Sequence, residues 1–246
     1  GEMGGGGSNA GDPRRAGSEF AVHWGLDPEV LFLNHGSFGA CPVPVLREQE
    51  RLRRQLEAEP VRFLHRESEA RYDEARRALA AFLGADPEGL AFVPNVTHGV
   101  NTVLRAVTLG AGDELLVTDH EYAACRNVLE VAAARTGARV VVARLPFPVT
   151  SDEQIVAAVT AAATPRTRLA LIDHVTSPTA LVLPAARIVR ELAARGIDTL
   201  VDGAHAPGMI PVEIDAIGAA WYTGNCHKWL CAPKGAGFLW ARQDRR

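Results

Sequence analysis

Lys228 and Asp202 are the two residues whose types and positions best suit catalysis by an amine and an acid. Lys228 follows an apolar run, residues 219–223, and stands next to His227. Asp202 directly follows the apolar residues 199–201. If both runs are strands of one sheet, the amine and the carboxylate lie near each other at its edge. The amine can bond to a carbonyl carbon or act as a base, and the carboxylate can pair with a cationic nitrogen. The structural alternatives are a solvated lysine and a helix-capping aspartate.

The composition predicts one large globular domain without a nucleic-acid or membrane partner. The chain has 246 residues, of which 47% are hydrophobic, and its formal net charge is −3. That balance gives no basic surface for nucleic acid or a lipid headgroup layer, and no apolar run is long enough to span a membrane. The four cysteines (Cys41, Cys125, Cys226 and Cys231) form no dense disulfide framework, so a reducing, cytoplasmic location is expected.

Three segments differ in composition. Residues 1–20 are rich in Gly, Ser and charge and lack a signal peptide's apolar core, which predicts a disordered leader or a cloning remnant. Residues 21–85 form an N-terminal segment with a polar loop at 34–39 and two charged amphipathic helices at 43–58 and 66–83. Residues 86–246 are predicted to be the main domain.

Strand and helix patterns alternate through this main domain. Short apolar runs predict strands, and the stretches between them have helical spacing. The strands are expected at 90–93, 114–118, 139–143, 169–173, 198–201, 219–223 and 237–240, and the helices at 97–106, 122–135, 152–163 and 185–195. This alternation predicts an α/β fold with three αβα layers and a mostly parallel, doubly wound sheet.

Ligands of such sheets bind at the carboxyl ends of the strands. Polar residues follow most of the predicted strands at that point: residues 95–99, 119–122, 173–177, 202–205 and 225–228. The sequence therefore brings polar groups from several separate segments to one edge, which favours a binding site over isolated surface residues.

The residues at this edge suit pyridoxal 5'-phosphate (PLP). Lys228 would form the Schiff base and Asp202 would pair with the pyridinium nitrogen. The helix start after Asn95 could bind the phosphate, although an ordinary helix cap is the alternative. Tyr122 could lie against a planar ring or be a core tyrosine, and His205 could reach the ring's phenolic oxygen.

Two other kinds of site are less well supported. Cys226, His227 and Cys231 are soft metal ligands in one segment, but no second ligand pair matches them and the spacing fits no standard zinc pattern, so no metal is expected. A serine hydrolase is also not favoured, because no Gly-x-Ser-x-Gly nucleophile elbow occurs.

Taken together, the motifs resemble the class V aminotransferase family of fold-type I PLP enzymes. The segments that carry the resemblance are FLNHGSFG at 32–39, FVPNVTHGVN at 92–101, DHEYAA at 119–124, RTRLALIDHV at 166–175, VDGAHAPG at 201–208 and WYTGNCHKWLCAPKGAGFLW at 221–240. They are most similar to the isopenicillin N epimerase-like branch, which is related to cysteine desulfurases. The resemblance implies an enzyme that acts at the α-carbon of an amino acid or an amino-acid-containing substrate.

The resemblance also implies roles for single residues. Lys228 and Asp202 would be catalytic. The cofactor would be bound by Val96, Thr97, Tyr122, Ser177, Asp202, His205, Asn225, His227 and Lys228. The substrate would be bound by Asn34, His35, Gly36 and Ser37. Active sites of the family lie at a dimer interface, so a homodimer is expected.

Three departures from the family pattern limit what the resemblance implies. Asn225 and Cys226 stand where relatives usually have serine and often glycine, and Ser177-Pro178 lacks an asparagine of many desulfurases. The chain ends at Arg246, where relatives continue into a C-terminal small domain that we expect to be absent here. The alternatives are a cysteine desulfurase or C–S lyase-type enzyme, and a truncated, non-catalytic PLP-fold domain.

Overall fold

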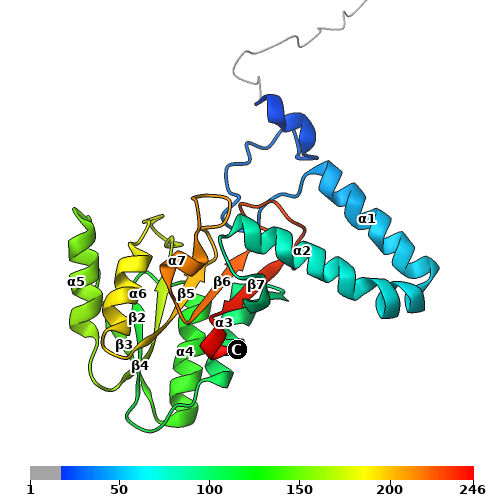
Figure 1. Ribbon diagram of the computed structural model, residues 1–246. Helices are drawn as coiled ribbons and strands as arrows, with labels where there is room; N and C mark the ends of the chain where they lie inside the picture. The colour runs from blue at the N-terminus through cyan, green and yellow to red at the C-terminus, as the bar shows by residue number, and fades with distance from the viewer. Residues whose placement is uncertain (1–17) are drawn as a thin grey trace, which may run out of the picture.

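The computed structural model describes residues 18–246, and its core is a seven-stranded sheet (Figure 1). The strand order is β1-β7-β6-β5-β4-β2-β3, and β7 is antiparallel to both of its neighbours while the others are parallel. The strands are β1 (Leu90–Val93), β2 (Glu114–Thr118), β3 (Arg139–Ala143), β4 (Thr167–Asp173), β5 (Asp198–Gly203), β6 (Trp221–Asn225) and β7 (Gly237–Ala241).

Helices cover both faces of the sheet. The helices are α1 (Val43–Ala58), α2 (Ser68–Phe82), α3 (Val96–Ala106), α4 (Ala123–Thr136), α5 (Asp152–Ala162), α6 (Ala185–Ala193) and the short α7 (Ile214–Ile217). Along β2, Leu115 and Val117 pack with α3 and α4, whereas Leu116 packs on the opposite face with α5 and α6. Because neighbouring strand residues point to opposite faces, fully buried parallel strands need apolar side chains at nearly every position. The predicted three-layer αβα fold with a mostly parallel sheet is confirmed.

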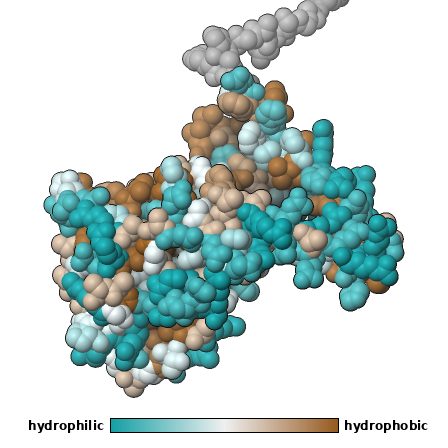
Figure 2. Space-filling view, viewed as in Figure 1, coloured by the Kyte–Doolittle hydropathy of each residue, from teal (hydrophilic) through white to brown (hydrophobic). Residues whose placement is uncertain are grey.

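The N-terminal segment projects from this core (Figure 1). It holds a 3₁₀ turn (Glu19–His23), α1, a π-helical turn (Arg62–Glu67) and α2. The end of α2 is buried in the core, where Ala80 and Leu83 pack with Ile214, Tyr222 and Phe238. Figure 2 shows apolar surface gathered around the start of this segment, where Leu31, Leu33 and Phe38 are exposed. Most of the predicted leader, residues 1–20, lies outside the described residues.

Element boundaries differ from the sequence prediction where local geometry overrides periodicity. The second helix begins at Ser68 rather than residue 66, because a π-helical turn precedes it. β5 extends through Asp202 to Gly203, so Asp202 lies inside the strand end rather than after it. The α7 turn and the 3₁₀ turns at Pro87–Gly89 and Gln243–Arg245 were not predicted, since they are too short to show a period.

The amino ends of β2, β3 and β4 are joined by a buried acid. Glu114 at the start of β2 has no exposed side-chain surface and receives hydrogen bonds from Arg139, Arg166 and Thr164. Burial by itself raises a carboxyl pKa, but these donors outweigh it and lower the pKa of Glu114 to about 2. The contact lies at the strand edge opposite the polar loops, so it serves the fold and not the site. Within residues 18–246, no helix is both long enough and apolar enough to cross a membrane.

Candidate functional site

One pocket at the carboxyl ends of the strands collects most of the predicted site residues. It encloses about 330 Å³, its open mouth included. The lining residues are Asn95, Val96, Thr97, Tyr122, Cys125, Asp173, Ser177, Asp202, Ala204, His205, Asn225 and Lys228. The predicted convergence of separate strand ends on one edge is therefore confirmed. Larger grooves run along α1, past Arg47, Glu50 and Arg54 for example, but they bring no comparable set of groups together.

Lys228 lies in the loop after β6, and its amine points to His205. The distance between Lys228 Nζ and His205 Nε2 is 3.1 Å. The indole Nε1 of Trp229 donates to His205 Nδ1 at 3.3 Å, so both ring nitrogens of the histidine are engaged. Burial lowers the pKa of Lys228, an effect that the carboxylate of Asp202 opposes. Burial and the nearby lysine lower the pKa of His205 to about 4, so this imidazole is neutral at neutral pH.

Asp202 is buried at the end of β5 with few donors around it. Its Oδ1 accepts a hydrogen bond from the Ala204 N–H at 2.8 Å, and its Oδ2 meets only the weak donor Cys125 Sγ at 3.5 Å. Burial raises its pKa, and the two hydrogen bonds together with the charge of Lys228 partly offset this. A buried carboxylate that accepts so few hydrogen bonds is suited to a cationic nitrogen that would enter the pocket.

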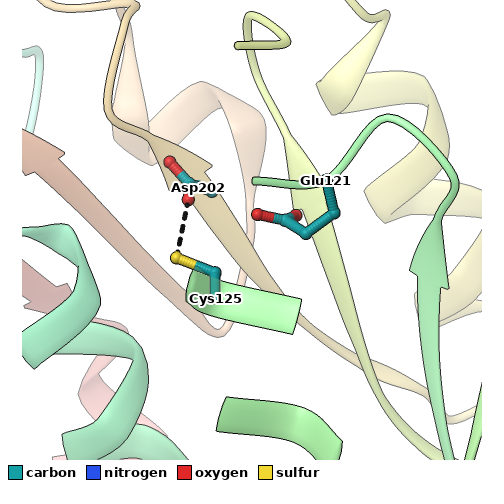
Figure 3. Close-up of side chains that lie close together, drawn as sticks. All are labelled: Glu121, Cys125 and Asp202. Atoms are coloured by element: carbon teal, nitrogen blue, oxygen red, sulfur yellow. Dashed lines mark hydrogen bonds between the residues drawn. The ribbon is translucent and has the colours of Figure 1, made fainter. Parts of the chain in front are cut away.

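Two further carboxyl groups lie beside Asp202. Asp173 ends β4 directly opposite Asp202 in the parallel register. Each lies two residues after a leucine that packs with α3 and α4, Leu171 and Leu200, so both aspartates are on that face of the sheet. Glu121, from the turn before α4, points its carboxyl group toward Asp202, with Cys125 beside them (Figure 3). One ligand atom from each of Glu121, Cys125 and Asp202 lies within 4.8 Å of the others.

The protonation of this cluster follows from its burial. Glu121 Oε2 and Asp173 Oδ2 are buried without a donor among the described residues. Carboxylates only accept hydrogen bonds, so neighbouring carboxyl groups bond to each other only when one of them carries a proton. Burial and the neighbouring acids raise the pKa values of Glu121 and Asp173 well above the ordinary range. Their raised pKa values favour the protonated forms of Glu121 and Asp173.

The start of α3 presents a backbone donor to the same pocket. Asn95 caps the helix by accepting from the His98 N–H at 2.9 Å, and Asn225 Oδ1 accepts from the Val96 N–H at 3.0 Å. The N–H of Thr97 between them has no partner within the described residues. Free N–H groups and the helix dipole favour an anion at this point. The side chain of Asn225 positions the helix start, a contact that the sequence did not reveal.

The remaining predicted residues lie at the mouth of the pocket or outside it. Tyr122 is half exposed at the mouth and directly precedes α4. The loop with Asn34, His35, Gly36 and Ser37 is closed by two hydrogen bonds between Asn34 and Ser37. It packs on the lysine loop, because a Cβ on Gly36 would meet His205 and Trp229 at 3.3 Å. None of these four loop residues lines the pocket.

His227 and Gly203 serve local structure. The ring of His227 turns away from the pocket to the carbonyl of Ala236, at 3.1 Å. The ring of Tyr222 fills the space beside Gly203: a Cβ on this glycine would lie 2.2 Å from it.

Sequence reasoning did not assign a role to Glu121, Cys125 or Trp229. The available signal for Cys125 was its position one turn after Tyr122. Trp229 follows the lysine directly, so it could have been flagged by adjacency alone. Glu121 could not have been found, since its burial depends on the packing of β2 against β4.

The sequence profile of the aminotransferase class-V family matches residues 33–246. The chain belongs to the class V aminotransferase family. An isopenicillin N epimerase from Amycolatopsis lactamdurans is 45% identical over 223 residues, covering 89% of this chain and 56% of the relative. An L-cysteine desulfhydrase from Arabidopsis thaliana is 31% identical, covering 92% and 52%. The chain thus spans about half the length of the curated relatives it matches.

Solved structures agree with this assignment. Two structures of the cystine C–S lyase C-DES match with TM-scores of 0.80 and 0.79 at 27% and 26% identity. Each match covers 87% of this chain and 57% of the other. In one of them, glycine is covalently linked to the PLP cofactor. The family, the fold and the cofactor class predicted from the sequence are therefore confirmed by class V relatives that carry PLP.

Proposed function

We propose that this chain is the cofactor-binding part of a PLP-dependent enzyme that acts at the α-carbon of an amino-acid-type substrate, like isopenicillin N epimerase. The observation that carries the proposal is the pocket itself. An amine with a lowered pKa, a buried carboxylate and a helix start with a free N–H meet there, from three distant segments.

The donor set fits PLP group by group. The Thr97 N–H at the start of α3 would bind the phosphate. The carboxylate of Asp202 would accept a hydrogen bond from the pyridine nitrogen. The negative charge of Asp202 would keep that nitrogen protonated. Tyr122 would lie against the ring, and Ser177 and His205 would provide polar contacts at its edge. His227 would contribute only if its ring turned away from Ala236.

The protein's own residues then have distinct tasks. When bound, PLP would withdraw electrons from the α-carbon of the substrate. Lys228 would hold the cofactor through its Nζ and, once released, would remove or return a proton at the α-carbon. Asp202 would act electrostatically, since its charge lies where positive charge on the ring must be kept. The loop that carries Asn34 and Ser37 would bind the substrate from above the lysine loop.

The first test is whether Lys228 binds the cofactor. We expect PLP to give a visible absorbance band that borohydride reduction removes while it makes the adduct permanent, with the added mass on the peptide that contains Lys228. Lys228→Ala should remove the band. An equal adduct in that variant would refute the site assignment, and no adduct in the wild type would leave only a non-catalytic PLP-fold domain.

The second test concerns Asp202 and uses a longer protein, in which this chain is extended to the length of its curated relatives. Asp202→Asn should lower turnover far more than it lowers PLP affinity, because its role is electrostatic. Turnover close to that of the wild type would contradict the proposal.

A C–S lyase activity is the second candidate. It is favoured by the similarity to C-DES and to the L-cysteine desulfhydrase, each of which matches this chain over about half of its own length. The two candidates separate in one experiment on the longer protein. Sulfide or persulfide release from cysteine or cystine would favour the lyase, whereas exchange of the α-proton with inversion would favour the epimerase.

We also propose a homodimer in a reducing compartment such as the cytoplasm. The exposed side chains of Leu31, Leu33 and Phe38 border the substrate loop, and a second copy would cover them. All four cysteines are free thiols, which suits a reducing environment. Light scattering should give twice the chain mass, and a monomer at micromolar concentration would refute the dimer.

A further inference from the structure

Trp229, His205 and Lys228 form a chain of two hydrogen bonds whose direction is determined by its first member. An indole N–H can only donate. Trp229 Nε1 lies 3.3 Å from His205 Nδ1, so that nitrogen must be the acceptor and carries no hydrogen. A neutral imidazole has a single N–H, which must then be on Nε2.

The position of this hydrogen fixes which atom donates in the second hydrogen bond, between His205 and Lys228. His205 Nε2 carries the hydrogen and lies 3.1 Å from Lys228 Nζ, so the lysine nitrogen has to accept it. An ammonium group has three N–H bonds and no lone pair, so only the neutral amine can accept. A protonated Lys228 would force the hydrogen onto His205 Nδ1, where it would oppose the N–H of Trp229.

We propose that Trp229 is a positioning residue, which fixes the tautomer of His205 and thereby keeps Lys228 a neutral amine. The neutral amine is the nucleophilic form of lysine, the one that can bond to an aldehyde carbon. The inference deepens the proposed role of Lys228, since it says how the lysine is made ready for the cofactor.

The charges around Lys228 do not by themselves explain a neutral amine. Asp202 and the thiol of Cys125 face the lysine and favour its protonated form. Burial opposes them by lowering the pKa of Lys228. The charge of the lysine in turn lowers the pKa values of His205 and His227, so neither histidine favours the ammonium form. The hydrogen-bond direction set by Trp229 therefore acts together with burial, against two nearby acids.

The chain allows a direct measurement of the lysine without cofactor. It contains only two lysines, Lys228 and Lys234. Lys234 donates to the Gly39 carbonyl at 2.8 Å and serves as an internal reference. Trace acylation of the PLP-free protein across a pH series, with each labelled peptide quantified by mass spectrometry, reports the neutral fraction of each amine.

Trp229→Phe is the informative variant, because it removes the N–H and keeps an aromatic ring. We expect labelling of Lys228 relative to Lys234 at pH 8 to fall about fivefold, the factor that one net hydrogen bond is worth, and its labelling profile to move to higher pH. Nitrogen chemical shifts of His205 should show the Nε2–H tautomer in the wild type and a mixture in the variant.

Trp24→Phe is the matched control. Trp24 donates to the Ala40 carbonyl at 3.2 Å and contacts His35, so its loss perturbs the N-terminal loop that packs on the lysine loop without touching His205. It should leave the Lys228 profile unchanged. An unchanged profile in Trp229→Phe, or equal shifts in both variants, would overturn the proposal. Because no cofactor is present, this outcome is independent of whether the chain binds PLP.

Discussion

Replacing Glu114 with Gln should remove a defined part of the protein's acid sensitivity. Glu114 is the buried carboxylate that joins the starts of β2, β3 and β4. Arg139 Nη2 and Arg166 Nη2 lie 2.6 Å and 2.9 Å from its Oε1, and Thr164 donates to Oε2 at 2.7 Å. The glutamine would keep the shape of the side chain but lose its charge, which leaves two guanidinium groups without an anionic partner.

The magnitude follows from the pKa of Glu114, which is lowered from 4.5 to about 2. At about 1.36 kcal/mol per pKa unit, the full shift corresponds to about 3.4 kcal/mol. Arg139 and Arg166 are 59% and 60% exposed, so water and salt screen them. We therefore expect about 2 kcal/mol of stability from the ionised state.

The sign follows from the direction of the shift. A carboxyl group with a lowered folded-state pKa stabilises the protein fully above its unfolded pKa, and this contribution is lost as the pH falls toward the folded value. Glu114→Gln should thus be less stable than the wild type by about 2 kcal/mol at pH 7. The difference should shrink steadily between pH 5 and pH 3, because only the wild type loses the contribution there.

Urea unfolding at several pH values, followed by circular dichroism, measures this difference. Other acids titrate equally in both proteins and cancel in the comparison. Glu48→Gln is the matched control, since the Glu48–Arg51 pair is exposed and should contribute little at any pH. If the difference in unfolding free energy between Glu114→Gln and the wild type were constant from pH 7 to pH 3, the electrostatic account would be refuted. The loss of stability would then come from packing alone.

Three further changes test the region around the pocket. Tyr222→Phe removes the hydroxyl that lies 2.9 Å from His174 Nδ1, and an unpaired buried nitrogen should cost about 1–3 kcal/mol of unfolding free energy; unchanged urea unfolding would contradict this. Gly203→Ala places a Cβ 2.2 Å from the fixed Tyr222 ring, so overpacking should cost at least about 1–3 kcal/mol, and a melting temperature like that of the wild type would show that the ring can move. Burial raises the pKa of Glu121, so this residue costs the wild type stability as the pH rises above the pKa that glutamate has in the unfolded chain. Glu121→Gln cannot ionise, so the stability of this variant relative to the wild type should increase from pH 4 to pH 8. Stability curves of the two proteins that stay parallel over this pH range would refute the raised pKa.

Much of the fold was predictable because its signals are local. Continuous apolar runs identified the strands, and polar residues after them located the sheet edge at which the pocket lies. Lys228 and Asp202 could be paired because each follows such a run. Neither the strand order nor the antiparallel β7 follows from periodicity, since pairing depends on contacts between segments far apart in the chain.

The finer features of the site depend on those distant contacts. Glu121 is an ordinary acidic residue in the sequence, and only the packing of its turn against β4 and β5 buries it beside Asp173 and Asp202. Gly203 is a second example. Nothing near it in the sequence shows what lies beside it, and the neighbouring strand β6 supplies Tyr222, whose ring occupies that space. In both cases the role of the residue depends on a side chain from a distant segment, and the topology of the sheet determines which segment that is.

The place of β7 has a consequence for the order in which the protein can fold during synthesis. β7 lies between β1 and β6, with Leu90 opposite Trp240 and Trp221 opposite Ala241. β1 therefore has no strand partner until residues 237–241 have emerged, about 150 residues later in the chain, and closing so long a loop is slow. A nascent chain would thus pair β2, β3, β4, β5 and β6 before β1 could join the sheet.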